Sequence, residues 1–395
     1  MSQQFDDYLW LINEEATEWL TFAADSSVPI YRRARELQKG VGDVRGQLVL
    51  DQAELRKKGL VKFSDAEQMF FTRKGLEQAT DQWLARYKAE RFSKANRIVD
   101  LCCGIGGDLR YLAAVGESIG YELDGPTAIL ASGNGVPNTR YQVKSANAES
   151  WLPAVGDFWH ADPDRRSNGK RTSQLEGYQP GEEQLLKWLA KAPNGAVKLA
   201  PAASATNETW IDCEVEYLGT RGECKQQMIW SGDLAQYPRQ TRATIVPHDG
   251  SPPRSIIGHD ASAQFAGKIM NYVYEPHSAV LAARLTDDLA DQLNIQRIES
   301  AVVFLTGDEE ILDPAIATFE VVKVMPFDQK KLRKAIRELG WSQLEIKRRA
   351  VEFDLEKLRK KLKCDGDGNG VLIVFRGRQR ATAILAKRIA RNGQR

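Results

Sequence analysis

The chain has 395 residues, of which 42% are hydrophobic and 27% are charged. This composition is typical of soluble globular proteins, and the length exceeds the roughly 250 to 300 residues at which one core stops growing, so we expect two or three domains. No run approaches the roughly 18 apolar residues of a membrane span, and the start lacks a signal peptide's basic and apolar regions, which predicts no membrane partner and a cytoplasmic location.

The net charge of +2 hides an uneven distribution. Residues 321–395 hold 21 Lys and Arg against 8 Asp and Glu, a balance of 21 − 8 = +13, which leaves 2 − 13 = −11 for residues 1–320. A basic end on an acidic body favours a phosphate-bearing partner, although a solvated helix surface explains the charge count equally well. The five cysteines form no Cys-x-x-Cys pair and the four histidines show no ligand spacing, so we predict no metal site.

The N-terminal region has a helical pattern. Apolar residues recur at helical spacing in residues 8–24 and again in residues 75–92. We therefore expect an α-helical region over residues 1–95.

From Arg97 onward, short apolar runs alternate with helix-compatible segments. The alternation predicts a parallel sheet covered by helices on both faces. Residues 211–230 then form two extended runs around a turn at 219–222, which predicts an antiparallel hairpin. The apolar runs, each ending in a polar or glycine-containing turn, cover residues 97–104, 118–125, 156–163 and 195–202.

The remainder predicts α+β structure. We expect a helix over residues 275–293 with Pro276 in its first turn. Beyond it, a strand pattern at 317–327 and a final strand at 370–377 flank helical patterns at 328–340 and 354–362. The segment "DGDGNG" at 365–370 imitates a calcium loop, but its twelfth position is Arg376 instead of the required Glu, so we predict a hairpin turn. The expected domains are a helical region at 1–95, a cofactor-binding domain at 96–246, a connecting region at 247–320 and a basic domain at 321–395.

A glycine-rich turn follows the first expected strand. Asp100 ends that strand, and Gly104 and Gly106 lie where a backbone must turn tightly or approach a ligand. Leu109 stands at the third glycine position of a dinucleotide fingerprint, which disfavours an NAD-dependent oxidoreductase. Glu122 lies 22 residues after Asp100, the distance at which an acid accepts hydrogen bonds from a ribose. A nucleoside with a charged amino-acid tail, S-adenosylmethionine, satisfies both signals.

The segments "DLCCGIGG", "GYELD", "SANAES" and "ADPDRR" resemble class I, Rossmann-like S-adenosylmethionine-dependent methyltransferases over about residues 65–246. The resemblance implies an α/β fold, a doubly wound sheet closed by an antiparallel hairpin. It implies that Asp124 replaces Glu122 at the ribose if the register differs by two. Cys102 is placed in the turn as a small packing residue, with a thiol nucleophile as the weaker alternative. The implied cofactor-binding residues are Asp100, Cys102, Gly104 and Gly106 at the methionine end, Glu122 or Asp124 at the ribose, and Asn147 and Ala148 at the adenine.

The expected strand within residues 156–163 leads into "ADPDRR" at the edge of the sheet where ligands bind. Asp162 there is the candidate proton acceptor or orienting group for methyl transfer. Amino-directed nucleic-acid methyltransferases carry a second proline and an aromatic residue after Pro163, where this chain has Asp164 and Arg165. A guanidinium can stack on a base or bind a phosphate, so these residues could hold RNA differently. The alternative is a local ion pair of Asp164 with Arg165 or Arg166.

Residues 321–395 resemble the THUMP-like domain that follows a methyltransferase core in a bacterial family. The resemblance rests on "LEIKRR" at 344–349, the segment 358–362 and the strand pattern at 371–378. By analogy with THUMP domains it implies RNA binding, in which basic side chains neutralise phosphates. The candidates are Lys347, Arg348, Arg349, Arg376, Arg378 and Arg380.

We therefore predict an S-adenosylmethionine-dependent methyltransferase that acts on structured RNA, either tRNA or rRNA. The alternative is a non-catalytic RNA-binding protein that keeps the cofactor-binding fold.

Overall fold

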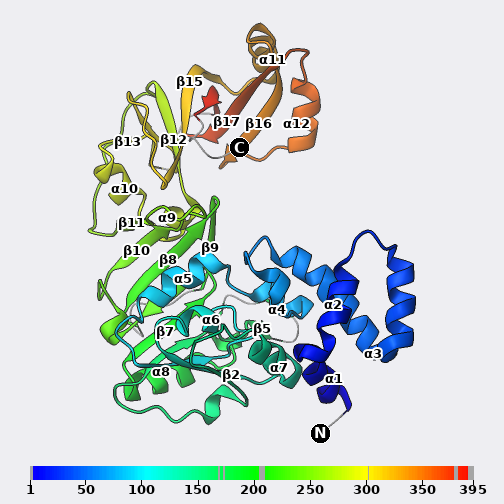
Figure 1. Ribbon diagram of the computed structural model, residues 1–395. Coiled ribbons are helices and arrows are strands. Elements are labelled where there is room, and N and C mark those ends of the chain that lie inside the picture. The colour runs from blue at the N-terminus through cyan, green and yellow to red at the C-terminus, as the bar shows by residue number, and fades with distance from the viewer. Residues whose placement is uncertain are drawn as a thin grey trace. The chain divides into compact units, whose positions relative to one another are not determined.

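The computed structural model describes residues 3–167, 170–171, 174–203, 210–300, 302–377 and 381–389. The chain divides into two compact units, Met1–Val215 with Gln226–Arg239 and Glu216–Lys225 with Gln240–Arg395. Figure 1 follows the elements from the blue N-terminal helices to the red C-terminal strand. None of the described helices is long and apolar enough to cross a bilayer.

The N-terminal part of the first unit is helical, as the sequence pattern predicts. Apolar side chains from successive helices pack together, including Trp10 of α1, Leu20 of α2 and Leu37 of α3. α5 begins at Asp81, whose carboxylate caps the helix by accepting the backbone N–H groups of residues 83 and 84. The helices are α1 (Gln3–Ile12), α2 (Thr17–Ala24), α3 (Ile30–Gly59), α4 (Arg73–Gln78) and α5 (Gln82–Glu90).

The following strands form one sheet of order β11-β10-β8-β9-β7-β4-β1-β2-β3. The five strands from β7 to β3 in this order are parallel, and β9 joins β7 in antiparallel pairing. The predicted doubly wound sheet and its closing hairpin are therefore confirmed. The strands are β1 (Arg97–Leu101), β2 (Glu117–Glu122), β3 (Tyr141–Ser145), β4 (Phe158–Ala161), β7 (Asn194–Leu199), β8 (Glu214–Thr220), β9 (Glu223–Trp230), β10 (Thr241–Ile245) and β11 (Arg254–Ile257); the short pair β5 (Arg166–Ser167) and β6 (Lys170–Arg171) lies apart.

The two faces of this sheet differ in polarity. Trp159 and Ala161 of β4 pack into an apolar cluster with Trp188 of α8 (Glu182–Lys191). Because successive strand residues point to opposite faces, Asp100 and His160 point away from that cluster. The opposite face therefore carries a buried polar row under the carboxyl ends of the strands. The other helices of this part are α6 (Leu109–Leu112) and α7 (Gly125–Gly133).

The second unit is built on a seven-stranded sheet of order β13-β14-β12-β15-β18-β17-β16. Its helices α9 and α10 precede the sheet's central strand β15, and α11 and α12 flank β16 in sequence (Figure 1). The elements are β12 (Tyr272–Pro276), α9 (Ser278–Ala282), α10 (Thr286–Gln292), β13 (Gln296–Arg297), β14 (Leu305–Gly307), β15 (Ile316–Pro326), α11 (Gln329–Glu338), β16 (Trp341–Arg349), α12 (Leu355–Leu362), β17 (Gly368–Arg376) and β18 (Ala381–Arg388).

The middle of β17, Val371–Phe375, is apolar because both of its faces are covered there. Leu372 and Val374 pack with Leu332 of α11 and Leu358 of α12. The alternate residues, among them Ile373, face a second apolar cluster on the other side. A strand buried on both faces carries a continuous apolar run, which is the pattern of "VLIVF".

Three local predictions about this unit are wrong. Pro276 ends strand β12, where it pairs with Ile316, and the expected helix over 275–293 is divided into α9 and α10. Residues 365–367 link α12 to β17, which runs parallel to β16, so they do not form a hairpin turn. β17 is not the final strand, because β18 pairs with it in antiparallel register. In each case the pairing of distant strands decides the structure.

Candidate functional site

The turn after β1 has the left-handed backbone that its glycines suggest. Gly104 has φ +57° and Gly106 has φ +80°, while Cys102 adopts φ +64° although it is not glycine. A Cβ on Gly106 would lie 2.3 Å from the hydroxyl of Tyr141, whereas a Cβ on Gly104 would meet nothing within 4 Å. Gly106 is therefore needed for packing, and the backbone of Gly104 borders open space.

Glu122, at the end of β2, is bonded to this turn. Its Oε2 accepts the backbone N–H of Gly104 at 2.9 Å, and its Oε1 accepts that of Asp124 at 2.9 Å. Burial raises the pKa of the Glu122 carboxyl. Asp124 instead caps α7, where its Oδ2 accepts the backbone N–H of Thr127 at 3.0 Å. This division of roles favours Glu122 over Asp124 as the candidate ribose ligand.

The predicted adenine residues lie after β3. Asn147 is exposed and its Oδ1 accepts the backbone N–H of Glu149 at 2.9 Å, whereas Ala148 is buried in the apolar cluster. Leu123, directly after Glu122, is 73% exposed. Sequence reasoning did not select Leu123, although its place beside the acid was the available signal. Its side chain gives this edge an apolar surface.

The backbone places Asp162 beside the glycine turn. Its N–H donates to the carbonyl of Leu101 at 3.1 Å, which extends the pairing of β4 with β1 by one residue. Its carboxylate Oδ2 accepts from the Lys198 ammonium at 2.5 Å. The side chain of Asp162 remains 30% exposed while that of Lys198 is 11% exposed. The ion pair thus fixes one carboxylate oxygen and leaves the group at the surface of the site.

The rest of the "DPDRR" segment is also held in place. Pro163 is buried, and Asp164 exchanges two backbone hydrogen bonds with Gln179. The Oδ2 of Asp164 accepts from Lys74 at 2.9 Å, so this acid is paired with a residue of α4. Arg165 is half-buried, and its positive charge acts to lower the pKa of Lys198. The side chain of Arg166 lies outside the described residues.

The carboxylates of the site influence the thiol of Cys102. Burial raises the pKa of the Cys102 thiol well above its usual range, and the negative charges of Glu122 and Asp162 raise it further, followed by those of Asp100 and Asp164. The structure thus brings the predicted turn, the candidate ribose ligand and the "DPDRR" acids together.

A chain of buried polar groups lies under the turn. His160 Nδ1 is 2.7 Å from Asp100 Oδ1, and His160 Nε2 is 3.4 Å from the ammonium of Lys88. With its proton on Nδ1, His160 donates to Asp100 and accepts from Lys88. Lys88 also pairs with Asp108 at 2.7 Å, and Asp108 accepts from the hydroxyl of Thr80 at 2.9 Å. The chain therefore connects α5 to both ends of the glycine turn.

Burial and pairing set the pKa values in this chain. Burial lowers the pKa of Lys88 and raises that of Asp100. Burial also opposes ionisation of Asp108, but the positive charge of Lys88, with that of Lys198, holds its pKa well below its usual range. Burial works against Lys198 as well, yet the carboxylates of Asp162 and Asp108 raise its pKa. For Asp108 and Lys198 the neighbouring opposite charges therefore outweigh the effect of burial.

Sequence reasoning missed Lys88, His160 and Lys198. Lys88 lies in a helix with no motif, and Lys198 is one polar residue in the apolar run "GAVKLAPA". For Lys198, the signal available in the sequence was a charged residue inside an apolar strand pattern. Only the pairing of β4 with β1 and β7 shows that these residues are neighbours.

The residues present fit S-adenosylmethionine. Asp100 Oδ2 is buried without a hydrogen-bond partner among the described residues, so an acceptor for an ammonium group is available. Gly104 borders open space beside Glu122, as the approach of a ligand to the turn requires. The predicted roles of the individual residues at the cofactor remain predictions.

Most of the described candidates for RNA binding form ion pairs or hydrogen bonds within the protein. Lys347 of β16 pairs with Glu275 at 2.6 Å, and Arg349 pairs with the same acid at 2.9 Å. Arg348 donates to the carbonyl of Phe353 at 2.5 Å, although it is exposed. Arg376 is exposed at the end of β17, while Arg378 and Arg380 lie outside the described residues.

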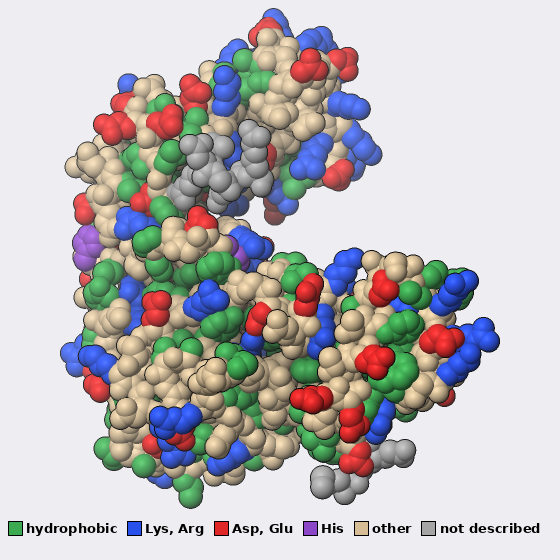
Figure 2. Space-filling view, viewed as in Figure 1, with side chains coloured by type: hydrophobic (Ala, Val, Ile, Leu, Met, Phe, Trp, Pro, Cys, Tyr) green, Lys and Arg blue, Asp and Glu red, His purple; other side chains and the backbone are tan. Residues whose placement is uncertain are grey.

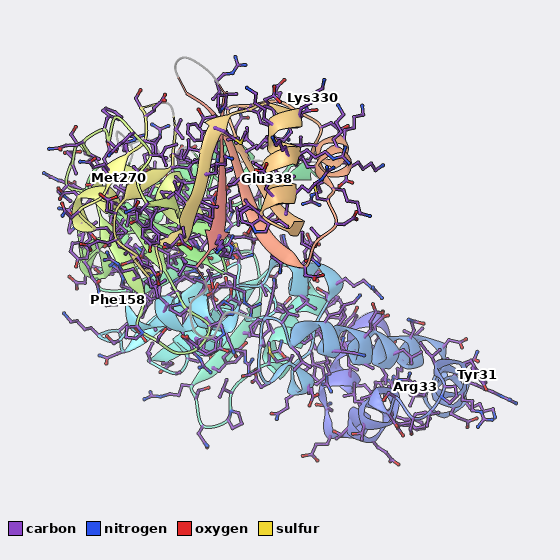
Figure 3. All side chains as sticks on the ribbon, turned by 90° about the horizontal axis from the view of Figure 1, so that it is seen from above. Tyr31, Arg33, Phe158, Met270, Lys330 and Glu338 are labelled. Atoms are coloured by element: carbon purple, nitrogen blue, oxygen red, sulfur yellow. The ribbon has the colours of Figure 1, made fainter. Side chains whose placement is uncertain are left out.

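Exposed cations gather instead on α11 and α12. The apolar face of each helix packs on the sheet, so its basic residues project outward. Figure 2 shows Lys and Arg side chains over these helices, and Figure 3 marks α11 by Lys330 near its start and Glu338 at its end. The exposed set is Lys330, Lys331, Arg333, Lys334 and Arg337 on α11, and Lys357, Arg359, Lys360 and Lys361 on α12.

Comparisons with known proteins agree with this structure. Residues 316–388 match the family model described as "THUMP domain-like". Relatives from two strains of Mycobacterium tuberculosis, named uncharacterized S-adenosylmethionine-dependent methyltransferases, are 29% identical over 314 residues, or 78% of this chain and 85% of theirs. The crystal structure of a putative methyltransferase from Porphyromonas gingivalis W83 superposes with a TM-score of 0.75 at 19% identity, covering 97% of this chain and 98% of that one.

The solved structure confirms the fold, and the mycobacterial relatives bear out the predicted enzyme class and its cofactor, S-adenosylmethionine. The chain therefore joins a Rossmann-like, S-adenosylmethionine-dependent methyltransferase to a C-terminal THUMP-like domain, as the resemblance in its sequence implies.

Proposed function

We propose that this enzyme methylates structured RNA and that Asp162 orients and deprotonates the acceptor. The observation that carries the proposal is the position of Asp162, whose N–H bonds to the last residue of β1 while its carboxylate is anchored by Lys198. In open α/β sheets ligands bind at this edge, beside the switch point between β1 and β4. The acceptor atom would therefore meet the carboxylate where the cofactor's methyl group is expected.

Each residue of the site has a distinct proposed role. Glu122 accepts hydrogen bonds from the ribose, and Asp100 provides the acceptor for the methionine ammonium group. When bound, the cofactor supplies a methyl group on a positively charged sulfur, which departs as a neutral thioether. Lys198 holds Oδ2 of Asp162, so Oδ1 is the atom that accepts the proton lost by the acceptor nitrogen or oxygen. Positioning and proton transfer are the two contributions that such a displacement needs.

The basic residues of α11 and α12 support RNA as the substrate. Their ammonium and guanidinium groups are exposed on neighbouring helices, which Lys361 links by donating to Gln329 of α11 at 3.2 Å. Such a surface neutralises several phosphates of a nucleic-acid backbone. The proposal thus moves the main RNA contacts from Lys347 and Arg349 to the two helices.

The test is methyl transfer from labelled cofactor to total RNA of a strain lacking this protein, followed by identification of the labelled nucleoside. We expect one labelled nucleoside with the wild-type protein. Asp162→Ala should lower the rate about 10²- to 10⁴-fold, the range for loss of a general base. Glu183→Gln, an exposed acid of α8, serves as the control and should keep the rate. Absence of label, or an unchanged rate with Asp162→Ala, would contradict the proposal.

A further inference from the structure

His160 of β4 is a buried titratable residue to which the proposed reaction gives no role. Its ring lies between Asp100 of β1 and Lys88 of α5, with Nδ1 at 2.7 Å from the carboxylate and Nε2 at 3.4 Å from the ammonium group. Because an ammonium group can only donate, Nε2 accepts from Lys88 and the ring proton lies on Nδ1. The imidazole therefore meets Asp100 as a neutral hydrogen-bond donor.

The charges around this ring do not cancel. Lys88 lies 2.7 Å from Asp108, so these two opposite charges offset each other. Lys198 is likewise paired, with Asp162 at 2.5 Å. A neutral imidazole brings no charge to the carboxylate of Asp100, whose side chain is almost fully buried. With Asp100 ionised, the buried row thus carries one net negative charge, and that charge lies on Asp100.

One oxygen of the Asp100 carboxylate is left over. Nδ1 of His160 is bonded to Oδ1, whereas Oδ2 is buried and has no hydrogen-bond partner among the described residues. An unsatisfied buried acceptor is costly, and more so when it is charged, so binding of an ammonium group at Oδ2 is favoured. Burial raises the pKa of Asp100 and the hydrogen bond from His160 opposes this rise, so the imidazole favours the ionised carboxylate that such a ligand needs.

We propose that His160 is a positioning residue for the cofactor: its Nδ1–H holds Oδ1 of Asp100 and leaves Oδ2 to receive the ammonium group of the methionine tail. The inference rests on the proposed function only in taking Asp100 as the acceptor for that group. A lysine or arginine in place of the imidazole would neutralise Asp100 and compete with the ligand, whereas a neutral ring orients the carboxylate and preserves its charge. Lys88 acts one step further away, because its hydrogen bond to Nε2 keeps the ring proton on Nδ1.

Two ligands that differ in their tail separate positioning from a structural role. S-adenosylhomocysteine carries the ammonium group, whereas methylthioadenosine keeps the nucleoside and the thioether but lacks that group. Calorimetric titration of the full-length protein with each ligand gives the two dissociation constants. His160→Leu removes the donor at similar volume and should weaken binding of S-adenosylhomocysteine about 10-fold or more, the value of a hydrogen bond to a charged group. Binding of methylthioadenosine should stay within about twofold of the wild type.

His160→Asn supplies the conservative rescue. Asparagine carries its amide nitrogen as many bonds from Cα as Nδ1 of histidine, so it donates to Oδ1 of Asp100 again. We expect His160→Asn to bind S-adenosylhomocysteine within about threefold of the wild type. A purely structural role predicts the opposite order, because the smaller polar side chain of asparagine suits a buried position less well than leucine does.

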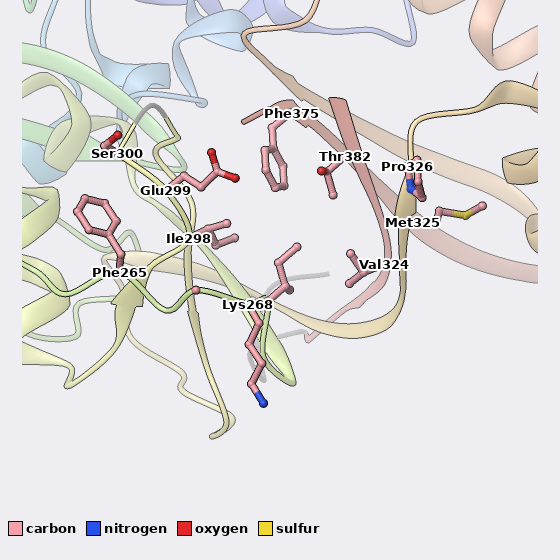
Figure 4. A pocket seen from close by; sticks show the side chains of 12 residues that line it. Phe265, Lys268, Ile298, Glu299, Ser300, Val324, Met325, Pro326, Phe375 and Thr382 are labelled. Carbon is pink, nitrogen blue, oxygen red and sulfur yellow. The ribbon is translucent and has the colours of Figure 1, made fainter. Parts of the chain in front are cut away.

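Two controls test for general damage and for a second binding place. Trp159→Phe removes the buried hydrogen bond from the neighbouring residue of β4 to the carbonyl of Ala192, on the opposite, apolar face, and should lower stability but leave both affinities unchanged. A cavity of about 500 Å³ in the second unit, lined by Phe265, Ile298 and Val324 among others, is also large enough for a nucleoside (Figure 4). Phe265→Ala should therefore leave both affinities unchanged if the ligand binds at the glycine turn.

Four results would overturn the proposal: an unchanged affinity of His160→Leu for S-adenosylhomocysteine, an equal loss of both ligands in that variant, weaker binding by His160→Asn than by His160→Leu, or loss of binding in Phe265→Ala. Asp100→Asn distinguishes this failure from failure of the proposed function. Unchanged binding of S-adenosylhomocysteine by Asp100→Asn would refute the proposed role of Asp100 itself. Weaker binding by Asp100→Asn together with unchanged binding by His160→Leu would refute the positioning role alone.

Discussion

Charged side chains are buried and paired at the glycine-turn site, whereas they are exposed on the basic helices α11 and α12. Under the turn, Lys88 and Asp108 lie 2.7 Å apart with side chains only 2% and 9% exposed. On α11 and α12 the cations are exposed, and the ion pair of Lys334 with Glu338 is long at 3.9 Å, with both side chains at the surface. Buried pairs fix geometry at a high cost of desolvation, whereas exposed cations stay hydrated and available. The same residue types thus build a rigid site in one region and a binding surface in the other.

The largest expected effect is on stability, and it tests whether the buried ion pairs hold the site in its folded geometry. Lys88→Met leaves Asp108 as an uncompensated buried charge, so we expect a loss of about 3 to 5 kcal/mol in the free energy of unfolding. Urea denaturation measures it. Lys58→Met, which removes a pair with both side chains exposed, should cost at most about 1 kcal/mol. Equal losses of unfolding free energy in the two variants would contradict the difference between buried and exposed ion pairs.

The second test concerns His277, a strongly perturbed histidine of the second unit. Burial lowers the pKa of His277 to about 4 from its ordinary 6.5, and its Nδ1 accepts the N–H of Ala279 at the start of α9. The unfolded chain takes up a proton first, so this histidine's stabilisation is present above about pH 6.5 and is lost as the pH falls toward 4.

The loss should approach about 3 kcal/mol at pH 4. His277→Asn keeps an acceptor at the cap without titrating, so denaturation curves at pH 7 and pH 4 should differ less for the variant than for the wild type. An equal pH dependence of both proteins would assign the acid sensitivity to other groups.

A third test separates two acids that lie two residues apart in the sequence, Glu122 and Asp124. Glu122→Ala removes the carboxylate bonded to the turn and should weaken S-adenosylmethionine binding about 10- to 100-fold, the value of one or two hydrogen bonds to a charged group. Asp124→Ala removes the cap of α7 and should cost about 1 kcal/mol of stability with affinity nearly intact. Calorimetry of both variants decides between them, and the reverse result would move the ribose contact to Asp124.

The smallest effect per residue belongs to the exposed helices. Replacing Lys331, Arg333, Lys334 and Arg337 together by Gln should lower the slope of log affinity for RNA against log salt by about 3 to 4. The paired residues Lys347 and Arg349 provide the control, because their replacement removes no available cation. Binding titrations across a salt series measure the slopes. If the control changes the slope more than the helix variant, "LEIKRR" is the RNA contact after all.

Local pattern predicted the parts of the molecule whose structure is local. The strand, the glycine turn and Glu122 occur within 26 residues, and their spacing was enough to indicate the cofactor. Lys198 is 36 residues from Asp162, and Lys88 is 72 from His160, so no spacing could connect them.

The sequence of the C-terminal region did not show, for a related reason, which of its cations are paired. "LEIKRR" is basic in sequence, but pairing of β12, β15, β18, β17 and β16 forms the sheet that carries both β16 and Glu275. The acid then neutralises Lys347 and Arg349. Net charge counts side chains without showing which of them fold against an opposite charge.

The raised pKa values of the two cysteine thiols in the glycine turn limit side reactions at the proposed site. A thiolate is a strong nucleophile and would compete for an activated methyl group, whereas a protonated thiol is a poor one. Burial raises the pKa of both Cys102 and Cys103 well above the usual range, with the carboxylates of the site adding to the shift. At neutral pH both thiols therefore stay protonated and are poor nucleophiles toward the expected alkylating cofactor, and the carboxylates proposed for the reaction contribute to this protection.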